Sequence, residues 1–228
     1  MFDRTSLWHR LESKDVTKGK REQCEILTNE HWGLAVVHRT PVRERSLSPV
    51  HGRDPEYIGS ADVIAIRDSV LALASVVLPY FRLVWGGHPS ITPLIAQVLR
   101  HYGKEVNNHV TLYQSLYFER FFPLENESVA HIVKTKDLGD RNDSLFEMRS
   151  RMICDNKFVA AFFIGGMEGV EEEFKMFTSF HKDAKIYPIA STGAAAKLIY
   201  DTSPAHFDER LVTELTYTSL FKELLNIK

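Results

Sequence analysis

Two glycine pairs in this 228-residue chain have the types and spacing that point most directly to chemistry. The first pair is Gly86-Gly87, and the second, Gly165-Gly166, follows the apolar run 158–164. Glycine lets a backbone approach a phosphate or a ribose closely, and the first N–H groups of a helix attract anions. The two turns therefore predict a binding site for a nucleotide-type ligand.

Other polar or small residues follow predicted strands and are candidates for the same site. In a parallel sheet all such turns lie at the carboxyl ends of strands, so they can converge on one crevice. For any one turn, the alternative is that glycine only permits a tight connection between strand and helix. Gln114 lies in an aromatic-rich segment that either contacts a nucleobase or belongs to the core. These further candidates are His88, Ser90, Gln114, Ser191, Thr192 and Gly193.

Glutamates crowd the helix that follows the second glycine pair. Solvated side chains that complement the helix dipole explain Glu171 and Glu173. Glu172 is instead a candidate to accept hydrogen bonds from sugar hydroxyls, or to act as an acid or a charge stabiliser in N-glycosidic cleavage. Glu168 and Gly169 lie in the same turn and belong to the candidate ligand site.

Two arginines, Arg149 and Arg151, lie on the predicted helix before the second glycine strand. A guanidinium binds phosphate through two parallel hydrogen bonds, so both are candidate phosphate ligands. The alternative for both is an ordinary surface salt bridge. If the chain is an enzyme, Arg149 and Glu172 are its candidate catalytic residues.

The elements that position these residues alternate between strands and helices. The alternation implies right-handed βαβ crossovers and an α/β fold that is Rossmann-like and doubly wound, with a mainly parallel sheet and helices on both faces. Strands are predicted at 33–37, 81–85, 110–113, 132–134, 158–164 and 185–188. Helices are predicted from Ser60, from Thr92 and Pro93, from Asp143 or Ser144, after Gly166, from Ala194, and around Leu211, Leu215, Leu220 and Leu224.

Composition excludes several functional classes. The 28 basic and 30 acidic residues give a net charge of −2, so neither duplex nucleic acid nor an anionic membrane is an expected partner. Cys24 and Cys154 stand alone, which indicates no disulfide framework and no structural metal. The apolar stretches 70–78 and 158–164 are shorter than the ~18 residues of a membrane span, and the N-terminus lacks an apolar signal segment. We therefore expect a cytoplasmic protein without a metal or other cofactor.

Residues 45–200 resemble the SLOG superfamily, a Rossmann-like group that includes the Lonely Guy phosphoribohydrolases and the DNA-processing protein DprA. The run 165–172 matches the glycine pair and the terminal glutamate of the Lonely Guy motif PGGxGTxxE, and Arg149 precedes it at a spacing close to that of the family's catalytic arginine. Ile164 replaces the proline, the third glycine comes one residue late, and Val170 lies near the expected threonine. By this resemblance, residues 1–40 are an N-terminal extension of unknown role and residues 41–228 form one SLOG-like domain.

The closer resemblance is to the defence-associated branch of this superfamily. Its members carry sequences similar to VWGGHPSITPL, VTLYQS, FIGGMEGVEEEF and IASTGAA, often beside or fused to TIR domains. This resemblance implies recognition of nucleotide-derived signals, including cyclic ADP-ribose-like products made from NAD. In that branch a serine-containing first strand and loop contributes to the pocket, and Ser46 and Ser48 are the corresponding residues here.

The leading hypothesis is a sensor of a nucleotide or NAD-derived small molecule in a stress or anti-phage system. Its expected partners are the ligand, a TIR-domain or other effector protein, and further copies of the chain in a homo-oligomer. The alternative is a nucleotide N-glycosidase of the Lonely Guy type. A DprA-like DNA-handling module is a third hypothesis, which the balanced charge disfavours.

Overall fold

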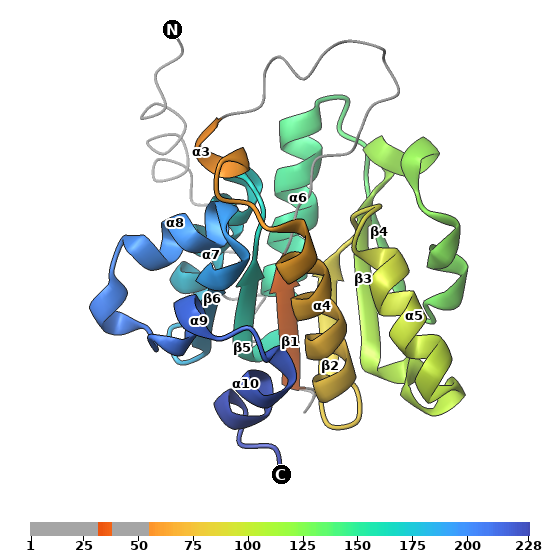
Figure 1. The fold of residues 1–228 in the computed structure, drawn as a ribbon. Coiled ribbons are helices and arrows are strands. Elements are labelled where there is room, and N and C mark those ends of the chain that lie inside the picture. Colours follow the sequence, from red (N-terminus) through yellow and green to blue (C-terminus); the bar gives the residue numbers. More distant parts are fainter. Residues whose placement is uncertain (1–31, 38–54) are drawn as a thin grey trace, which may run out of the picture.

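The structure, a computed structural model, describes residues 32–37 and 55–228 (Figure 1). Six strands form one sheet in the order β4-β3-β2-β1-β5-β6, and every neighbouring pair is parallel. The strands are β1 (Trp32–Val37), β2 (Arg82–Gly86), β3 (Val110–Ser115), β4 (Ile132–Thr135), β5 (Lys157–Ile164) and β6 (Lys185–Ile189).

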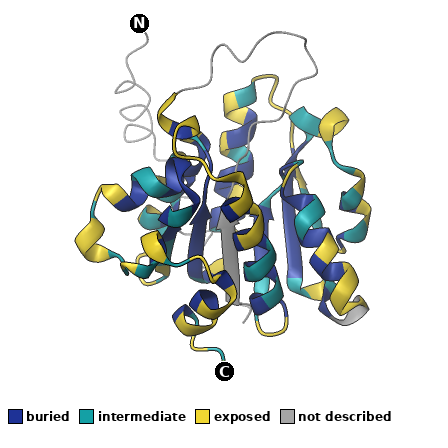
Figure 2. Ribbon diagram, in the orientation of Figure 1, coloured by how far each residue is buried: buried dark blue, intermediate teal, exposed yellow. Residues whose placement is uncertain are grey.

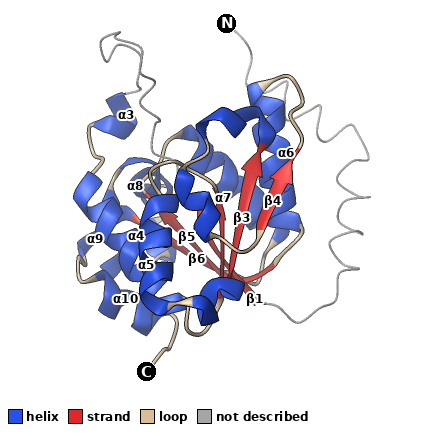
Figure 3. Ribbon diagram, turned by 90° about the vertical axis from the view of Figure 1, so that its right-hand side faces the viewer, coloured by secondary structure: helices blue, strands red, loops and turns tan. Residues whose placement is uncertain are grey.

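Helices connect successive strands and cover both faces of the sheet (Figure 3). They are α3 (Pro55–Ile58), α4 (Val63–Val77), α5 (Thr92–Tyr102), α6 (Arg141–Cys154), α7 (Glu168–Phe180), α8 (Ala194–Asp201), α9 (Arg210–Thr213) and α10 (Tyr217–Leu224). The 3-10 helices η1 (Lys104–His109), η2 (Leu116–Phe121), η3 (Leu124–Ser128), η4 (Ala190–Thr192) and η5 (Pro204–His206) lie between them. None of the described helices has the length and apolarity of a membrane-crossing segment.

Side chains of successive strand residues point to opposite faces, and each face has its own apolar core (Figure 2). Leu83 and Trp85 of β2 pack with α4, α5 and α10, whereas Val84 between them packs with α6, α7 and α8. Because both faces are covered, the strands are apolar in nearly every position. This explains why continuous apolar runs, and not alternating patterns, mark them in the sequence.

The predicted fold class is confirmed: the sheet is parallel, Rossmann-like and covered by helices on both faces. Each predicted strand is present within two residues at either end. The boundary at residue 40 has to move, since β1 lies before it and pairs with both β2 and β5. The sheet-forming part of the chain therefore includes Trp32–Val37.

Three helix starts differ from the prediction. Helix α6 begins at Arg141, with Asp140 as its N-cap, and not at Asp143 or Ser144. Asp62, and not Ser60, caps α4, because its Oδ1 accepts hydrogen bonds from the N–H groups of Ile64 and Ala65, each at 2.9 Å. At α5 the N-cap is Ile91, so Thr92 is already helical. Ser60 is instead a tertiary contact, described below.

The predicted C-terminal helix is broken into α9 and α10. The carboxylate of Glu214 accepts hydrogen bonds from the N–H groups of Leu215 and Thr216, which closes a turn between the two helices. Leu215 is therefore 63% exposed, while Leu211 and Leu220 are buried in the core. A local side-chain contact has overridden the apolar periodicity.

The segment 55–62, which contains α3, lies against the start of α8 near the upper end of the sheet in Figure 1. Ser60 Oγ accepts a hydrogen bond of 2.9 Å from the N–H of Ala194, and the N–H of Asp62 donates to the carbonyl of Thr192 at 3.2 Å. Gly193 has φ +72°, and a Cβ atom there would lie 1.7 Å from the carbonyl oxygen of Ser60. Only glycine fits this approach.

We expect Gly193→Ala to lower the free energy of unfolding by about 3 kcal/mol or more, since it combines backbone strain with overpacking against Ser60. The matched control is Gly139→Ala, which has φ +80° but no atom within 4 Å of the added Cβ. That control should lose only the strain of about 1 kcal/mol. Equal losses in urea denaturation of the two variants would contradict the close contact with Ser60.

Candidate functional site

The candidate site lies where the connections change direction, between β1 and β5. Successive strands proceed outward from β1 to β4, and the chain then returns to place β5 on the other side of β1. In an open parallel sheet, ligands bind outside the carboxyl ends of the strands at such a point. The two glycine turns follow β2 and β5, the two neighbours of β1, so they flank it.

The second glycine turn is fixed to the start of α8 by hydrogen bonds. The N–H of Gly165 donates to Thr192 Oγ1 at 2.8 Å. The carbonyl of Gly165 accepts from Ala196 N–H at 3.0 Å, and that of Gly166 accepts from Ala195 N–H at 3.3 Å. Gly166 has φ +92°, so the backbone turns sharply into α7. These contacts hold the turn in one conformation.

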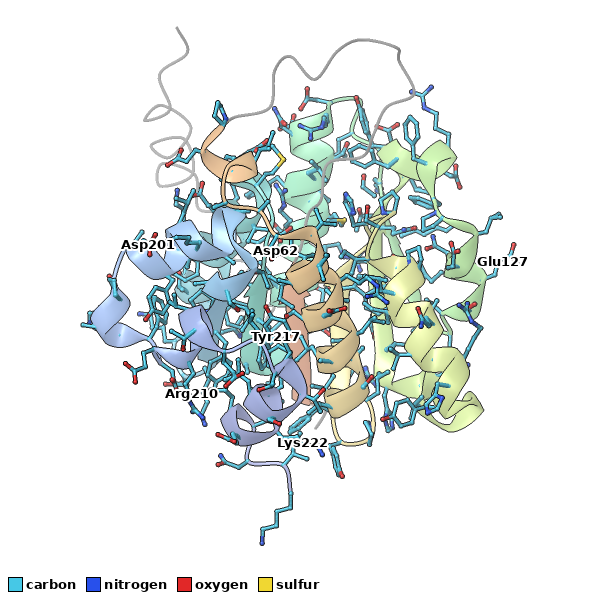
Figure 4. All side chains as sticks on the ribbon, viewed as in Figure 1. Asp62, Glu127, Asp201, Arg210, Tyr217 and Lys222 are labelled. Carbon is cyan, nitrogen blue, oxygen red and sulfur yellow. The ribbon has the colours of Figure 1, made fainter. Side chains whose placement is uncertain are left out.

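The third predicted turn, Ser191-Thr192-Gly193, is occupied by internal contacts. Thr192 is fully buried, and its hydroxyl also donates to the carbonyl of Ile189 at 2.5 Å. Ser191 Oγ lies 3.1 Å from the hydroxyl of Tyr217 at the start of α10 (Figure 4), and burial raises the pKa of that tyrosine. The N–H groups at the start of α8 bind the glycine carbonyls and Ser60. The polar groups of the turn 191–193 are therefore used by contacts within the protein, and Thr192 hydrogen-bonds the second glycine turn.

The start of α7 offers backbone N–H groups within a cluster of carboxylates. Met167 is its N-cap, no described side chain caps this end, and Glu168 is exposed. Glu171 Oε2 accepts a hydrogen bond of 2.9 Å from the hydroxyl of Tyr57 on α3. Burial and the neighbouring glutamates raise the pKa of Tyr57, so it stays a donor at neutral pH. Gly169 is buried under the same turn.

Arg149 joins α6 to α7 through two carboxylates. Its Nε donates to Glu173 Oε1 at 2.9 Å, and its Nη1 donates to Glu172 Oε2 at 2.5 Å. The side chains of Arg149 and Glu173 are 6% and 9% exposed, whereas that of Glu172 is 58% exposed. The interpretation of Glu173 as a solvated dipole partner is wrong, because the buried guanidinium holds it inside.

Burial raises the pKa of Glu173, and the charge of Glu172 adds to this effect, while the Arg149 guanidinium opposes both. Arg151, the other predicted phosphate ligand, points away and pairs with Asp155 on the surface at 3.1 Å. Of the two arginines, only Arg149 is part of the site beside the second glycine turn. Its guanidinium faces carboxylates from α7.

The first glycine turn rests on a buried pair of amides. The N–H of Gly87 donates to the carbonyl of Tyr113 at 2.7 Å. A Cβ atom at Gly87 would lie 2.3 Å from Nε2 of Gln114, which is 2% exposed. Gln114 in turn accepts a hydrogen bond of 2.7 Å from Nδ2 of Asn126. Gln114 is therefore a buried side chain packed against Gly87, and it is not exposed where it could contact a base.

His88 and Ser90 lie in the loop between the first turn and α5. His88 is 7% exposed, and its Nδ1 accepts a hydrogen bond of 3.1 Å from the N–H of Ser90. This contact places the imidazole proton of the neutral form on Nε2. Gly86 faces α6, where an added Cβ would lie 3.3 Å from Cε of Met148. Helix α6 thus contacts the first turn through Met148 and α7 through the next residue, Arg149.

The structure brings Arg149 and Glu172 together on the helices before and after β5, and α6 also contacts Gly86 through Met148. Ser46 and Ser48 lie outside the described residues. Sequence reasoning missed Glu173, although its spacing from Val170 and Phe177 places it on the buried face of α7. Tyr57 and Asn126 carried no such signal, since each meets its partner only through the tertiary fold.

Within the described part of the chain, no three His, Cys, Asp or Glu side chains are grouped so that they could hold a metal ion. A Rossmann-like sheet with glycine turns beside its switch point defines a class of proteins that bind small molecules at strand ends. The chain belongs to the SLOG cluster3 family, whose model matches residues 56–225. This membership suggests a nucleotide-related ligand or a glycosidase-like activity.

Comparison with solved structures finds the X-ray structure of TM1055, a target of the Northeast Structural Genomics Consortium. The two chains are 19% identical with a TM-score of 0.49, and the match covers 75% of this chain and 81% of that one. No curated protein matches the chain.

We expect Arg149→Ala to lower the free energy of unfolding by about 3–5 kcal/mol at neutral pH, because it leaves Glu173 buried without its counter-ion. The matched control is Arg151→Ala, which removes an exposed pair worth at most ~1 kcal/mol. The double variant Arg149→Ala/Glu173→Gln should recover part of the loss. Denaturant titration of the four proteins would contradict the buried pair if Arg149→Ala and Arg151→Ala behaved alike.

The loss in Arg149→Ala should also depend on pH. Removing the guanidinium raises the pKa of Glu173 further, so the folded variant binds a proton more tightly than its unfolded chain. Its stability then falls as pH rises above the ordinary pKa of a carboxyl group. The difference in unfolding free energy between Arg149→Ala and the unmodified protein should be smaller near pH 5 than at neutral pH. In the double variant, which lacks the Glu173 carboxyl group, this difference should no longer depend on pH.

Proposed function

We propose that this protein binds a nucleotide or NAD-derived small molecule at the carboxyl ends of β2, β1 and β5. The observation that carries the proposal is the exposed Glu172 carboxylate in the first turns of α7, the helix that follows the second glycine turn at the switch point of the sheet. Carboxylates there accept hydrogen bonds from sugar hydroxyls, and the open start of α7 offers N–H groups to the same ligand. The ligand would contact the backbone of Gly165 to Gly169 and the side chains of Glu168 and Glu172.

The first turn would supply the opposite wall. Gly86 ends β2, which pairs with β1 on the side away from β5, and Gly87, His88 and Ser90 follow it. His88 and Ser90, joined by the hydrogen bond from the Ser90 N–H to His88 Nδ1, would form part of this wall. Gln114, Thr192 and Gly193 would support the two walls without contacting the ligand.

The proposed role is sensing in a stress or anti-phage system. Its support is the resemblance of four long stretches, around both glycine turns, β3 and η4, to the TIR-linked branch of the superfamily. The proposed ligand is then a cyclic ADP-ribose-like product of NAD, and the proposed partner is a TIR-domain or other effector protein. We also propose a homo-oligomer in the cytoplasm.

Calorimetry with AMP, ADP-ribose and cyclic ADP-ribose tests the binding site. At least one compound should bind, and Glu172→Gln should weaken that binding by about 1.5–3 kcal/mol, the range for a hydrogen bond to a charged group. Glu223→Gln is the matched control, since Glu223 is also an exposed glutamate paired with an arginine but lies on α10. Binding that Glu172→Gln leaves unchanged, or the absence of binding to all three compounds, would contradict the proposal.

One observation favours a second function, nucleotide N-glycosidase. Arg149 and Glu172, the candidate catalytic pair of the Lonely Guy resemblance, are in direct contact at the proposed site. Glu172 would stabilise the positive charge that develops on the sugar as the base departs. The motif around it nevertheless lacks the proline and the early third glycine.

Because the motif is incomplete, we expect incubation with AMP or NAD to release no free base at an enzyme-like rate. Chromatography of the products over several hours measures this directly. Turnover that disappears in Glu172→Gln and persists in Glu223→Gln would replace the sensing function with hydrolysis.

A further inference from the structure

The guanidinium of Arg149 is divided between one buried and one exposed carboxylate of adjacent residues. We propose that Glu173 is a positioning residue: it holds Arg149 through Nε, so that Nη1 presents the Glu172 carboxylate to the sugar hydroxyls of the ligand. This inference rests on the proposed function, which supplies the ligand. It assigns the ribose of that ligand, and not its phosphate, to the position beside Glu172. Arg149 is then an internal counter-ion and not a phosphate ligand.

The hydrogen-bond geometry supports this assignment. Arg149 is 5% exposed, and both of the edges that its guanidinium presents to α7 already donate to carboxylates, at 2.9 and 2.5 Å. A phosphate that approached Arg149 at Nη1 would have to displace Glu172. The first six residues of α7 carry four carboxylates, and two of them, Glu172 and Glu173, contact this single guanidinium. A dianionic group is therefore repelled here, while a hydroxyl group donates to Glu172 without competing with Arg149.

The cost of burying the pair argues against a purely structural role. Two helices are joined at least as well by apolar side chains of the same volume as by a buried ion pair. Helix α7 already packs through Val170 and Phe177, which flank Glu173 on its buried face. The guanidinium adds what those contacts do not provide, namely a fixed orientation for a carboxylate at the site.

Binding of AMP and of adenosine, which lacks the phosphate, separates the two roles of Arg149. Glu173→Gln should weaken the binding of both compounds by the same factor, about tenfold or more, because the ribose contact through Glu172 is common to them. Glu173→Asp retains the charge but retracts the carboxylate by one methylene, so it should restore only part of the affinity. Glu223→Gln again serves as the control.

Equal affinity in Glu173→Gln and the unmodified protein would overturn the inference. So would a loss confined to AMP, because that result assigns Arg149 to the phosphate. If the unmodified protein binds neither compound nor ADP-ribose, the proposed function fails and the positioning role is decided by a second measurement.

That measurement needs no ligand. In NMR spectra of the labelled protein, Glu173→Gln should shift the Nε–H resonance of Arg149 and the carboxyl carbon resonance of Glu172. Glu173→Asp should shift both signals in the same direction by a smaller amount. A Glu172 resonance that neither variant moves would overturn the inference regardless of what binds.

Discussion

The hydroxyl of Thr192 fixes the position of the candidate site. It accepts a hydrogen bond from the N–H of Gly165 and donates one to the carbonyl of Ile189, so it connects the ends of β5 and β6. The carbonyls of Gly165 and Gly166 then accept hydrogen bonds from the N–H groups of Ala196 and Ala195 in α8, which fixes the turn that leads into α7. Without this link the glycine turn would have many conformations, and the start of α7 would have no fixed direction.

Helix α6 contacts both halves of the sheet and therefore fixes their relative position. Its Met148 lies under the end of β2, and its Arg149 reaches the two glutamates of α7. Consecutive residues of one helix therefore contact the end of β2 and the helix that follows the second glycine turn. The site depends on these contacts of α6 as much as on the glycines, because the two glycine turns alone do not set the distance between them.

The sequence predicted the sheet well and the site in part. Apolar runs such as 158–164 identify parallel strands that are covered on both faces, and the glycine turns identify their carboxyl ends. The prediction failed where a local polar contact replaced the periodic pattern, as Glu214 does between α9 and α10. Glu173 was misread because charge was given more weight than its place on the apolar face of α7.

Other site features could not be predicted because they arise from contacts between distant segments. Tyr57 meets Glu171 across 114 residues, and Ser60 meets Ala194 across 134. No local pattern encodes such pairs. The same reason explains why Gln114 was expected to face a ligand: its buried position depends on Asn126, which reaches it from η3.

The second glycine turn combines two features that usually oppose each other. Its glycine conformation and open helix start are typical of phosphate sites, yet the glutamates of the first turn of α7 place negative charge beside the same N–H groups. Arg149 compensates part of that charge from the buried side, where a ligand does not reach. The outward side therefore presents hydrogen-bond acceptors beside backbone donors, which matches a polyhydroxylated sugar better than a phosphate. A phosphate on the same ligand would be better accommodated at the first turn, where Gly87 and His88 bring no carboxylate of their own.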